Sequence, residues 1–265
     1  MPKISIITIC YNEPDVEKTC ESIVNQTWQD FEWIVVDGGS NKETLDVFEK
    51  YKSRMAVFIS EPDSGIYNAM NKGIKLAKGE YLNFLNAGDY YENTEVLAGI
   101  ISSLDHDIVS GDIKLLNLDG TSTIWVAEDK VDDKLLITGT IPHPSSFIKN
   151  DLFKKYGGYD ENYKIVSDWE KWIDFLKVHK CSYKHVNHLC CVFNMNGVSS
   201  KNLELCKKER NEIISKYFSK KEIDKALNNI KYSLFERIFS IKNGVGNTHK
   251  IITILGFKIK IKRSK

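Results

Sequence analysis

The sequence has no long apolar segment of the kind that crosses a membrane or directs export. No window approaches the ~20 consecutive apolar residues that span a bilayer, and no small-residue cleavage site follows the short apolar run at residues 4–10. Hydrophobic residues make up 42% of the 265-residue chain and charged residues 28%, as in ordinary globular proteins. We therefore expect a cytoplasmic protein built from one large domain, or from one domain and an appendage.

The cysteine spacings that mark metal-binding fingers are also absent. The six cysteines contain no Cys-x-x-Cys pair and show no zinc-like spacing with histidine. They are Cys10, Cys20, Cys181, Cys190, Cys191 and Cys206. Several lie in apolar stretches, where a free thiol behaves as a small hydrophobic side chain. In a cytoplasmic protein they are expected to be reduced core residues.

Two common nucleotide-binding motifs are missing. No GxGxxG follows the first apolar strand, and no GxxxxGK[ST] occurs anywhere in the chain. These absences disfavour a Rossmann cofactor site and a P-loop phosphate site.

The net charge of +1 conceals a strong asymmetry between two parts of the chain. Residues 1–200 carry 20 Lys and Arg against 30 Asp and Glu, a net charge of −10. Residues 201–265 carry 17 against 6, a net charge of +11, in a pattern that predicts basic helices. Opposite charges indicate different partners for the two parts. We predict a domain at 1–200 and a basic helical C-terminal extension at 201–265.

Strand and helix patterns alternate through the first 90 residues. Apolar runs at 3–12, 31–40, 55–63 and 80–89 predict strands, and the segments 16–28, 45–51 and 65–79 between them predict helices. Ser40 and Glu43 are spaced as a capping box for the second helix. Strands this apolar, separated by helices, predict an α/β fold with a parallel sheet covered on both faces.

Polar residues follow all four of these strands. The loops read CYNEPD at 10–15, DGGS at 37–40, EPDSG at 61–65 and NAGD at 86–89. In parallel sheets ligands bind outside the carboxyl ends of the strands. Acidic groups repel a diphosphate unless a divalent cation lies between them, and oxygen ligands suit Mg²⁺ or Mn²⁺. The residues therefore predict a metal–nucleotide site near Asp89, with a simple turn as the alternative.

Four segments, taken in order, resemble the inverting family 2 glycosyltransferases with a GT-A fold. They are ISIITICYNE, WIVVDGGS, GIYNAMNKGIKLAKGEYLNFLNAGD and GGYDENYKIVSDWEKW, and the resemblance covers about residues 3–195. It implies a Rossmann-like mixed sheet with helices on both faces. It also implies transfer of a sugar from a nucleotide-sugar donor, with a UDP-sugar favoured, to a hydroxyl acceptor, usually in surface polysaccharide synthesis.

The resemblance also implies the donor-binding residues. Thr8, Tyr11 and Glu13 match nucleotide-contacting positions, and Asp37 matches the aspartate that accepts a hydrogen bond from the base. A carboxylate suits that role because uracil and guanine both present an N–H donor. Two further candidates from the donor-covering segment are Asp63 and Lys72, although Lys72 is equally compatible with a solvated helix face.

One motif departs from the family pattern. Where the family has a DxD-type cluster, this chain has Asn86, Ala87, Gly88 and Asp89. Only Asp89 keeps a charge, so it is the expected metal ligand. Asn86 is expected to bind the sugar or the ribose.

Asp168 matches the catalytic base of the family. A single carboxylate can take the proton of the acceptor hydroxyl as this hydroxyl attacks the anomeric carbon. Ser167 and Glu170 are also spaced as a capping box, in which Asp168 would be a first-turn acid; both interpretations can hold together. His143 and Trp169 are acceptor-side candidates, with core packing as the alternative.

Two other functions remain open at this point. A sugar nucleotidyltransferase shares the sheet type, but its first loop is normally glycine-rich and basic, whereas CYNEPD is acidic. A catalytically inactive nucleotide-sugar-binding protein would bind the donor without transferring the sugar.

The tail from Lys250 contains no acidic residue and interleaves basic with apolar side chains. This pattern predicts attachment to the anionic inner face of the plasma membrane, near a lipid-linked or glycan acceptor. An edge strand with a solvated basic end is the alternative. Nucleic acid is not an expected partner, because the tail offers no base-reading fold.

Overall fold

The computed structural model describes residues 2–117, 119–195 and 202–228, and the backbone of three strands between 239 and 262. The chain divides into two compact units, and each is described by itself. The first comprises Met1–Asp132 and Thr140–Ile213, and the second comprises Asp133–Gly139 and Ile214–Lys265.

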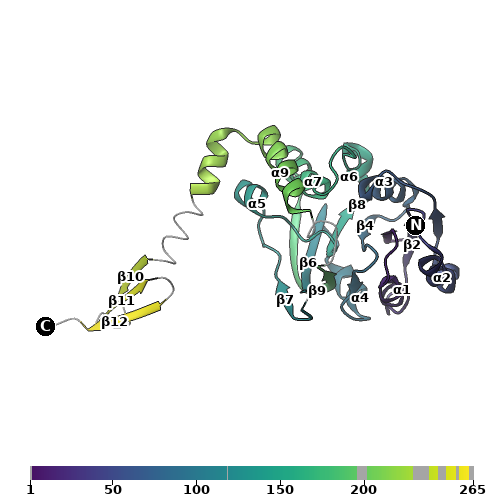
Figure 1. The fold of residues 1–265 in the computed structure, drawn as a ribbon, viewed down its shortest axis with the longest axis horizontal. Coiled ribbons are helices and arrows are strands. Elements are labelled where there is room, and N and C mark those ends of the chain that lie inside the picture. The colour runs from purple at the N-terminus through teal and green to yellow at the C-terminus, as the bar shows by residue number, and fades with distance from the viewer. Residues whose placement is uncertain are drawn as a thin grey trace. The chain divides into compact units, whose positions relative to one another are not determined.

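In the described part of the first unit, nine strands form one mixed sheet (Figure 1). Its order is β3-β2-β1-β4-β8-β6-β9-β5, and β7 pairs with β6. The strands are β1 (Ile4–Cys10), β2 (Phe31–Asp37), β3 (Val57–Ser60), β4 (Tyr81–Phe84), β5 (Tyr90–Tyr91), β6 (Ile108–Leu116), β7 (Ser122–Trp125), β8 (Ser146–Lys149) and β9 (Tyr183–Asn194). The first four strands of that order are parallel, as the apolar runs predicted, and antiparallel pairing begins where β4 meets β8.

The first three helices lie between the strands in the order that the sequence predicted. In the first unit they are α1 (Val16–Val24), α2 (Lys42–Tyr51), α3 (Ile66–Leu76), α4 (Val96–Ile100), α6 (Asn150–Tyr156) and α7 (Ser167–Ile173). The last of these continues as a π-helix at Asp174–Val178, and short 3₁₀ turns follow α2 and α4. The final helix, α9 (Leu203–Tyr217), begins in the first unit and ends in the second.

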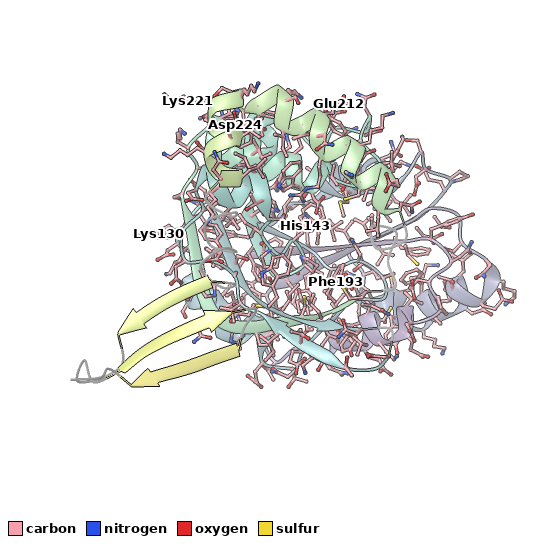
Figure 2. The ribbon with its side chains drawn as sticks, turned by 60° about the vertical axis from the view of Figure 1, so that its left-hand side comes forward. Lys130, His143, Phe193, Glu212, Lys221 and Asp224 are labelled. Carbon is pink, nitrogen blue, oxygen red and sulfur yellow. The ribbon has the colours of Figure 1, made fainter. Side chains whose placement is uncertain are left out.

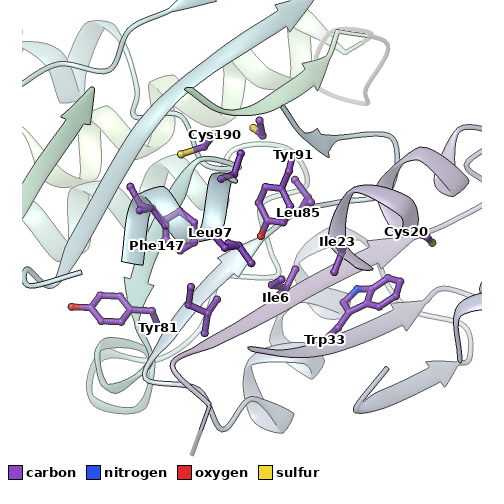
Figure 3. Packing of buried hydrophobic residues seen from close by; sticks show 14 of the residues in the cluster. Ile6, Cys20, Ile23, Trp33, Tyr81, Leu85, Tyr91, Leu97, Phe147 and Cys190 are labelled. Atoms are coloured by element: carbon purple, nitrogen blue, oxygen red, sulfur yellow. The ribbon is translucent and has the colours of Figure 1, made fainter. Parts of the chain in front are cut away.

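Alternate residues of β1 pack on opposite faces of the sheet, because successive side chains of a strand point to opposite sides. Ile4 and Ile6 belong to the core cluster that contains Cys20 and Ile23 of α1 (Figure 3). Ile7 faces the other way: a methyl group added to Gly73 of α3 would lie 2.5 Å from Ile7 Cγ2. Helices therefore cover both faces, as expected.

The start of α2 differs from the expected capping box. Asn41 is the N-cap, and its side chain accepts a hydrogen bond from Thr44 N at 3.1 Å. Ser40 Oγ instead accepts from Asn12 N at 2.8 Å. The Ser40–Glu43 box is therefore wrong, because the serine side chain joins two loops rather than capping the helix.

The cysteines match their predicted role as core residues. All six are free thiols, four of them buried and two, Cys181 and Cys206, partly exposed. Burial raises the pKa of Cys10 and of Cys20 to about 12. The buried thiols therefore stay protonated at neutral pH.

The second unit contains α5 (Asp133–Thr138), the end of α9, a helix at 220–228 and a three-stranded antiparallel sheet. The strands are β10 (Phe239–Asn243), β11 (His249–Ile254) and β12 (Phe257–Lys262). Within its described residues, the extension is thus helical up to residue 228 and forms strands beyond it, where apolar and basic residues alternate with a period of two from Phe257 onward. Within the described residues, no helix is both long enough and apolar enough to cross a membrane.

Candidate active site

The loops that follow β1, β2 and β4 lie at one edge of the sheet and are bonded to one another. Asn12 links the first two loops, because its N–H donates to Ser40 Oγ and its Oδ1 accepts from Asn41 N at 2.7 Å. In the loop after β4, Ala87 N donates to Ile9 O at 3.0 Å. The predicted convergence of polar strand ends is therefore confirmed.

Asp37, at the end of β2, has one satisfied and one unsatisfied carboxylate oxygen. Its Oδ2 accepts from Gly39 N at 3.1 Å, Ser40 N at 3.0 Å and Ser60 Oγ at 2.6 Å. The residue is fully buried, and its Oδ1 has no hydrogen-bond partner among the described residues. A buried acceptor without a donor is costly, so Oδ1 is fitted to receive an N–H from a ligand.

Gly38 allows two predicted site residues to approach the end of β2. A methyl group at this position would lie 2.6 Å from Asp63 Oδ2 and 3.4 Å from Tyr11 Cδ2. Asp63 is fixed by Gly65 N, which donates to its Oδ1 at 2.8 Å, and Tyr11 is 68% exposed. Asp63, Tyr11 and Asp37 are therefore neighbours around one glycine.

Lys72 extends from α3 toward the loop that carries Asp63. Its Nζ lies 2.7 Å from Glu61 Oε1 and 3.4 Å from Pro62 O, and 24% of its side chain is exposed. The lysine therefore has an anionic neighbour in this loop and does not simply point into solvent.

Asp89 lies in the loop after β4, close to Glu13. It is 5% exposed, and its Oδ1 accepts from Asn194 N at 2.9 Å. Burial raises the pKa of Asp89 to about 8; the Asn194 N–H opposes this increase and the nearby Glu13 carboxylate adds to it. Gly88, at φ +96°, allows this approach, because a methyl group on it would lie 3.2 Å from Glu13 Cδ.

The same loop holds a second unsatisfied oxygen. Asn86 Oδ1 is buried and has no hydrogen-bond partner among the described residues. Asn86, Asp89 and Glu13 thus supply the oxygen donors that Mg²⁺ and Mn²⁺ prefer. No cluster of three or more His, Cys, Asp or Glu residues with metal-binding geometry occurs in the part of the chain that the structure describes. Substrate oxygens would have to complete the coordination of a cation here.

Asp168 stands in the first turn of α7 and is partly exposed. Its Oδ1 accepts from the hydroxyl of Tyr67, on α3, at 2.8 Å. The expected Ser167–Glu170 capping box is wrong: Ser167 is already helical, Val166 is the N-cap, and Ser167 Oγ is buried without a hydrogen-bond partner among the described residues.

His143 lies in the interior (Figure 2), and Trp169 is also buried. His143 is 7% exposed, its Nε2 is 2.8 Å from Tyr159 Oη, and its ring packs against Phe84. Burial lowers the pKa of His143, although Asp168 opposes this change. Trp169 is 2% exposed, with the guanidinium of Arg210 3.9 Å from its ring centre. Both side chains are therefore buried, as the alternative of core packing predicted, and their acceptor-side role stays a prediction.

Thr8 lies in the strand that leads to the site. It is fully buried in β1, and its hydroxyl accepts from Trp33 Nε1 at 3.0 Å. Its nucleotide-contacting role stays a prediction.

Two residues near Asp168 were not predicted. Tyr67 contacts Asp168 across 101 positions of sequence, and Glu209 of α9 contacts the backbone just before α7. No local spacing could have indicated either contact, because each joins elements that are far apart in the chain.

Comparison with known proteins identifies the family. The family model described as glycosyl transferase family 2 matches residues 5–157. A Mycobacterium bovis protein named as a PGL/p-HBAD biosynthesis glycosyltransferase is 34% identical over 177 residues, covering 64% of this chain and 68% of the relative. An uncharacterized glycosyltransferase of Rickettsia typhi is 29% identical and covers 94% and 83% respectively.

Two solved structures share the fold. The S. aureus protein TarS, solved in complex with UDP-GlcNAc, has a TM-score of 0.63 at 20% identity, covering 88% of this chain and 73% of that one. The Pyrobaculum calidifontis mannosyltransferase PcManGT, solved with GDP-Man and Mn²⁺, has a TM-score of 0.63 at 16% identity, covering 87% and 69%. The mixed sheet is therefore a GT-A fold, and the chain is a glycosyltransferase that belongs to glycosyl transferase family 2.

Proposed function

We propose that this enzyme is a metal-dependent, inverting transferase that moves a sugar from a nucleoside-diphosphate sugar to a hydroxyl acceptor, in surface polysaccharide or glycolipid synthesis. The observation that carries the proposal is the unsatisfied, buried Oδ1 of Asp37 at the carboxyl edge of the sheet. Uracil and guanine both present an N–H that this oxygen can accept. The TarS complex with UDP-GlcNAc and the PcManGT complex with GDP-Man support a nucleoside-diphosphate sugar as donor, and we propose a UDP-sugar.

A divalent cation fits the oxygen donors of the β4 loop. Asp89 would hold Mg²⁺ or Mn²⁺, with Asn86 and Glu13 beside it and the diphosphate oxygens completing the coordination. The bound ion would offset the negative charge that develops on the leaving diphosphate. The Mn²⁺ in the PcManGT structure supports this role.

Asp168 would act as the general base. One carboxylate takes the proton of the acceptor hydroxyl while the hydroxyl oxygen forms its bond to the anomeric carbon. The bond from that carbon to the diphosphate breaks on the opposite face, so the configuration inverts. Tyr67, which donates to Asp168 Oδ1, limits the orientations that this carboxylate can adopt.

A thermal-shift panel of UDP- and GDP-sugars, each with Mn²⁺ and with EDTA, tests the proposal. A donor that binds only the folded state raises stability by RT ln(1 + [L]/Kd). We expect a UDP-sugar to raise Tm only when Mn²⁺ is present, and to be consumed when an acceptor is added. A shift without transfer to any acceptor would favour an inactive binding protein. Synthesis of the donor from a nucleoside triphosphate and a sugar phosphate would favour a nucleotidyltransferase.

Asp37→Asn should weaken donor binding without unfolding the protein. Three donors already hold Oδ2, so the amide oxygen should take that position and the NH₂ group should take the place of Oδ1. The NH₂ would then face the N–H of the base. Hydrogen bonds to charged groups contribute about 1.5–3 kcal/mol, so Kd should rise roughly 10- to 100-fold. Titration calorimetry measures this change, and Asp46→Asn, on the exposed side of α2, is the control for charge. Equal affinities of wild type and Asp37→Asn would show that the base binds elsewhere.

The two parts of the chain would have different roles. Residues 1–200 would carry out transfer, and the extension at 201–265, apart from the beginning of α9 that belongs to the first unit, would hold the enzyme at the inner face of the plasma membrane, near a lipid-linked acceptor. In β12, Lys258, Lys260 and Lys262 occupy alternate positions of the strand. Each basic residue near an anionic surface contributes about 1 kcal/mol.

Co-sedimentation with vesicles tests this attachment. The full chain should pellet with anionic vesicles at low salt and remain in solution with neutral ones. A chain ending at Asn247 should lose this binding, and replacing Lys258, Lys260 and Lys262 with Gln should weaken it while keeping the strand length. Equal pelleting of the full and shortened chains would exclude the tail as the attachment.

A further inference from the structure

The loop before α7 is held at both its N–H and its C=O groups by side chains from distant elements. Glu209 of α9 accepts from Lys164 N at 2.7 Å through Oε1 and from Ile165 N at 3.0 Å through Oε2. The Ile165 carbonyl oxygen accepts from Tyr67 Oη at 2.6 Å. The peptide groups of Ile165 are therefore fixed from two sides, three residues before Asp168.

Glu209 is well placed to hold this loop rigidly. It is 6% exposed, and both of its carboxylate oxygens accept from backbone N–H groups. Charge-assisted hydrogen bonds of this kind are shorter and stronger than neutral ones. The next residue of α9, Arg210, lies over the ring of Trp169, which follows Asp168 in α7. One turn of α9 thus contacts the chain on both sides of Asp168.

Tyr67 connects the same loop to the carboxylate itself. Its hydroxyl lies within hydrogen-bonding distance of both Ile165 O and Asp168 Oδ1, and its single proton is shared between these two acceptors. Burial raises the pKa of Tyr67 well above its usual value, and Asp168 adds to this increase. The phenol is therefore protonated, and able to donate a hydrogen bond, at neutral pH.

We propose that Glu209 and Tyr67 are positioning residues for the catalytic base, and that α9 therefore contributes a residue that supports the active site. This inference rests on the proposed role of Asp168. It assigns a catalytic purpose to a helix that lies beyond residues 5–157, the segment matched by the family model. Neither side chain need touch the substrate, because each acts through the backbone or the carboxylate that it holds.

Glu209→Gln tests the contribution of α9. The amide keeps the size of the side chain but leaves one of the two backbone N–H groups facing an NH₂ group. Because small displacements of a reacting group can cost about 10²-fold in rate, we expect kcat to fall roughly 10- to 100-fold. The donor KM and the donor-induced thermal shift should both stay within about twofold of the wild-type values. The reason is that the substitution removes no interaction that binds the donor in the ground state. Glu212→Gln, an exposed position on the same helix, is the matched control and should leave all three values unchanged (Figure 2).

Tyr67→Phe tests the second contact with little change in packing. It should lower kcat with the same unchanged donor KM. In the Asp168→Asn background, neither substitution should lower the residual rate further, because residues that act as a unit are not additive. Full additivity there, or a wild-type kcat in both single variants, would overturn the inference.

The test also separates this inference from the proposed function. Full turnover by Asp168→Asn would overturn the proposed base and this inference with it. Loss of turnover in Asp168→Asn, together with wild-type turnover in Glu209→Gln and Tyr67→Phe, would overturn the inference alone. If Glu209→Gln proved too unstable to assay, Tyr67→Phe would decide the question.

Discussion

Asp168→Asn should lower kcat by roughly 10²–10⁴-fold, the usual effect of removing a general base. The amide has nearly the shape of the carboxylate and can still accept the Tyr67 hydroxyl at 2.8 Å, so the local structure should persist. The donor-induced thermal shift should remain, because the residues expected to hold the nucleotide lie on other loops. Single-turnover assays with labelled donor would measure the chemical step directly.

Asp151→Asn provides a matched control. Asp151 is also an acidic residue in the first turn of a helix, α6, but its side chain is 85% exposed and pairs with Lys154. Its loss should cost only ~0.3–1 kcal/mol of stability through the helix dipole and leave turnover unchanged. If Asp168→Asn behaved in the same way, Asp168 would be a helix-start acid and not the base.

Asp89→Asn should abolish Mn²⁺-dependent donor binding and at the same time stabilise the metal-free protein at alkaline pH. Burial raises the pKa of Asp89 to about 8 in the folded state, whereas an unfolded chain has an aspartate pKa of about 3.9. Between these values the folded state holds a proton that the unfolded state has released. The wild type therefore loses stability as pH rises through this window, by up to ~1.4 kcal/mol per pH unit.

Asparagine has no such proton to lose. In EDTA, the Tm advantage of Asp89→Asn should be small near pH 4, grow with pH and level off above about pH 8. Thermal unfolding of both proteins across this range, followed by the donor panel with Mn²⁺, measures both effects. A variant that is less stable at pH 9 would show that the carboxylate is ionised and satisfied in the folded protein. Unchanged Mn²⁺-dependent binding would show that the NAGD loop is only a turn.

The sequence predicted the sheet and its polar edge because these depend on local patterns. Buried parallel strands are continuous apolar runs, and the residues that end them must share one edge. Asp37, Asp63 and Asp89 were found in this way, and all three lie at that edge. The strand that leads to Thr8 was also predicted correctly, and in it the Thr8 hydroxyl accepts from Trp33 Nε1.

The predictions were wrong where one sequence pattern is compatible with two different local structures. A Ser-x-x-Glu spacing predicts a helix start, yet Ser40 bonds to Asn12, and Ser167 already lies within its helix. For His143, rings from β4 and from the region around Tyr159 enclose the side chain, as the alternative of core packing predicted. Contacts such as Tyr67 with Asp168 depend on the final packing of helices, which no local spacing reveals.

Chemical labelling of the buried thiols can measure how often the surrounding structure opens locally. Cys191 lies in β9, fully buried, and Asp89 is among the groups that raise its pKa. A thiol in this state reacts with an alkylating reagent only when the surrounding structure opens. With the partly exposed Cys181 and Cys206 replaced by serine, the alkylation rate of Cys191 would report how often the sheet opens beside the Asp89 loop. Measured with and without Mn²⁺ and donor, the rate would give the free energy with which the ligands close this region.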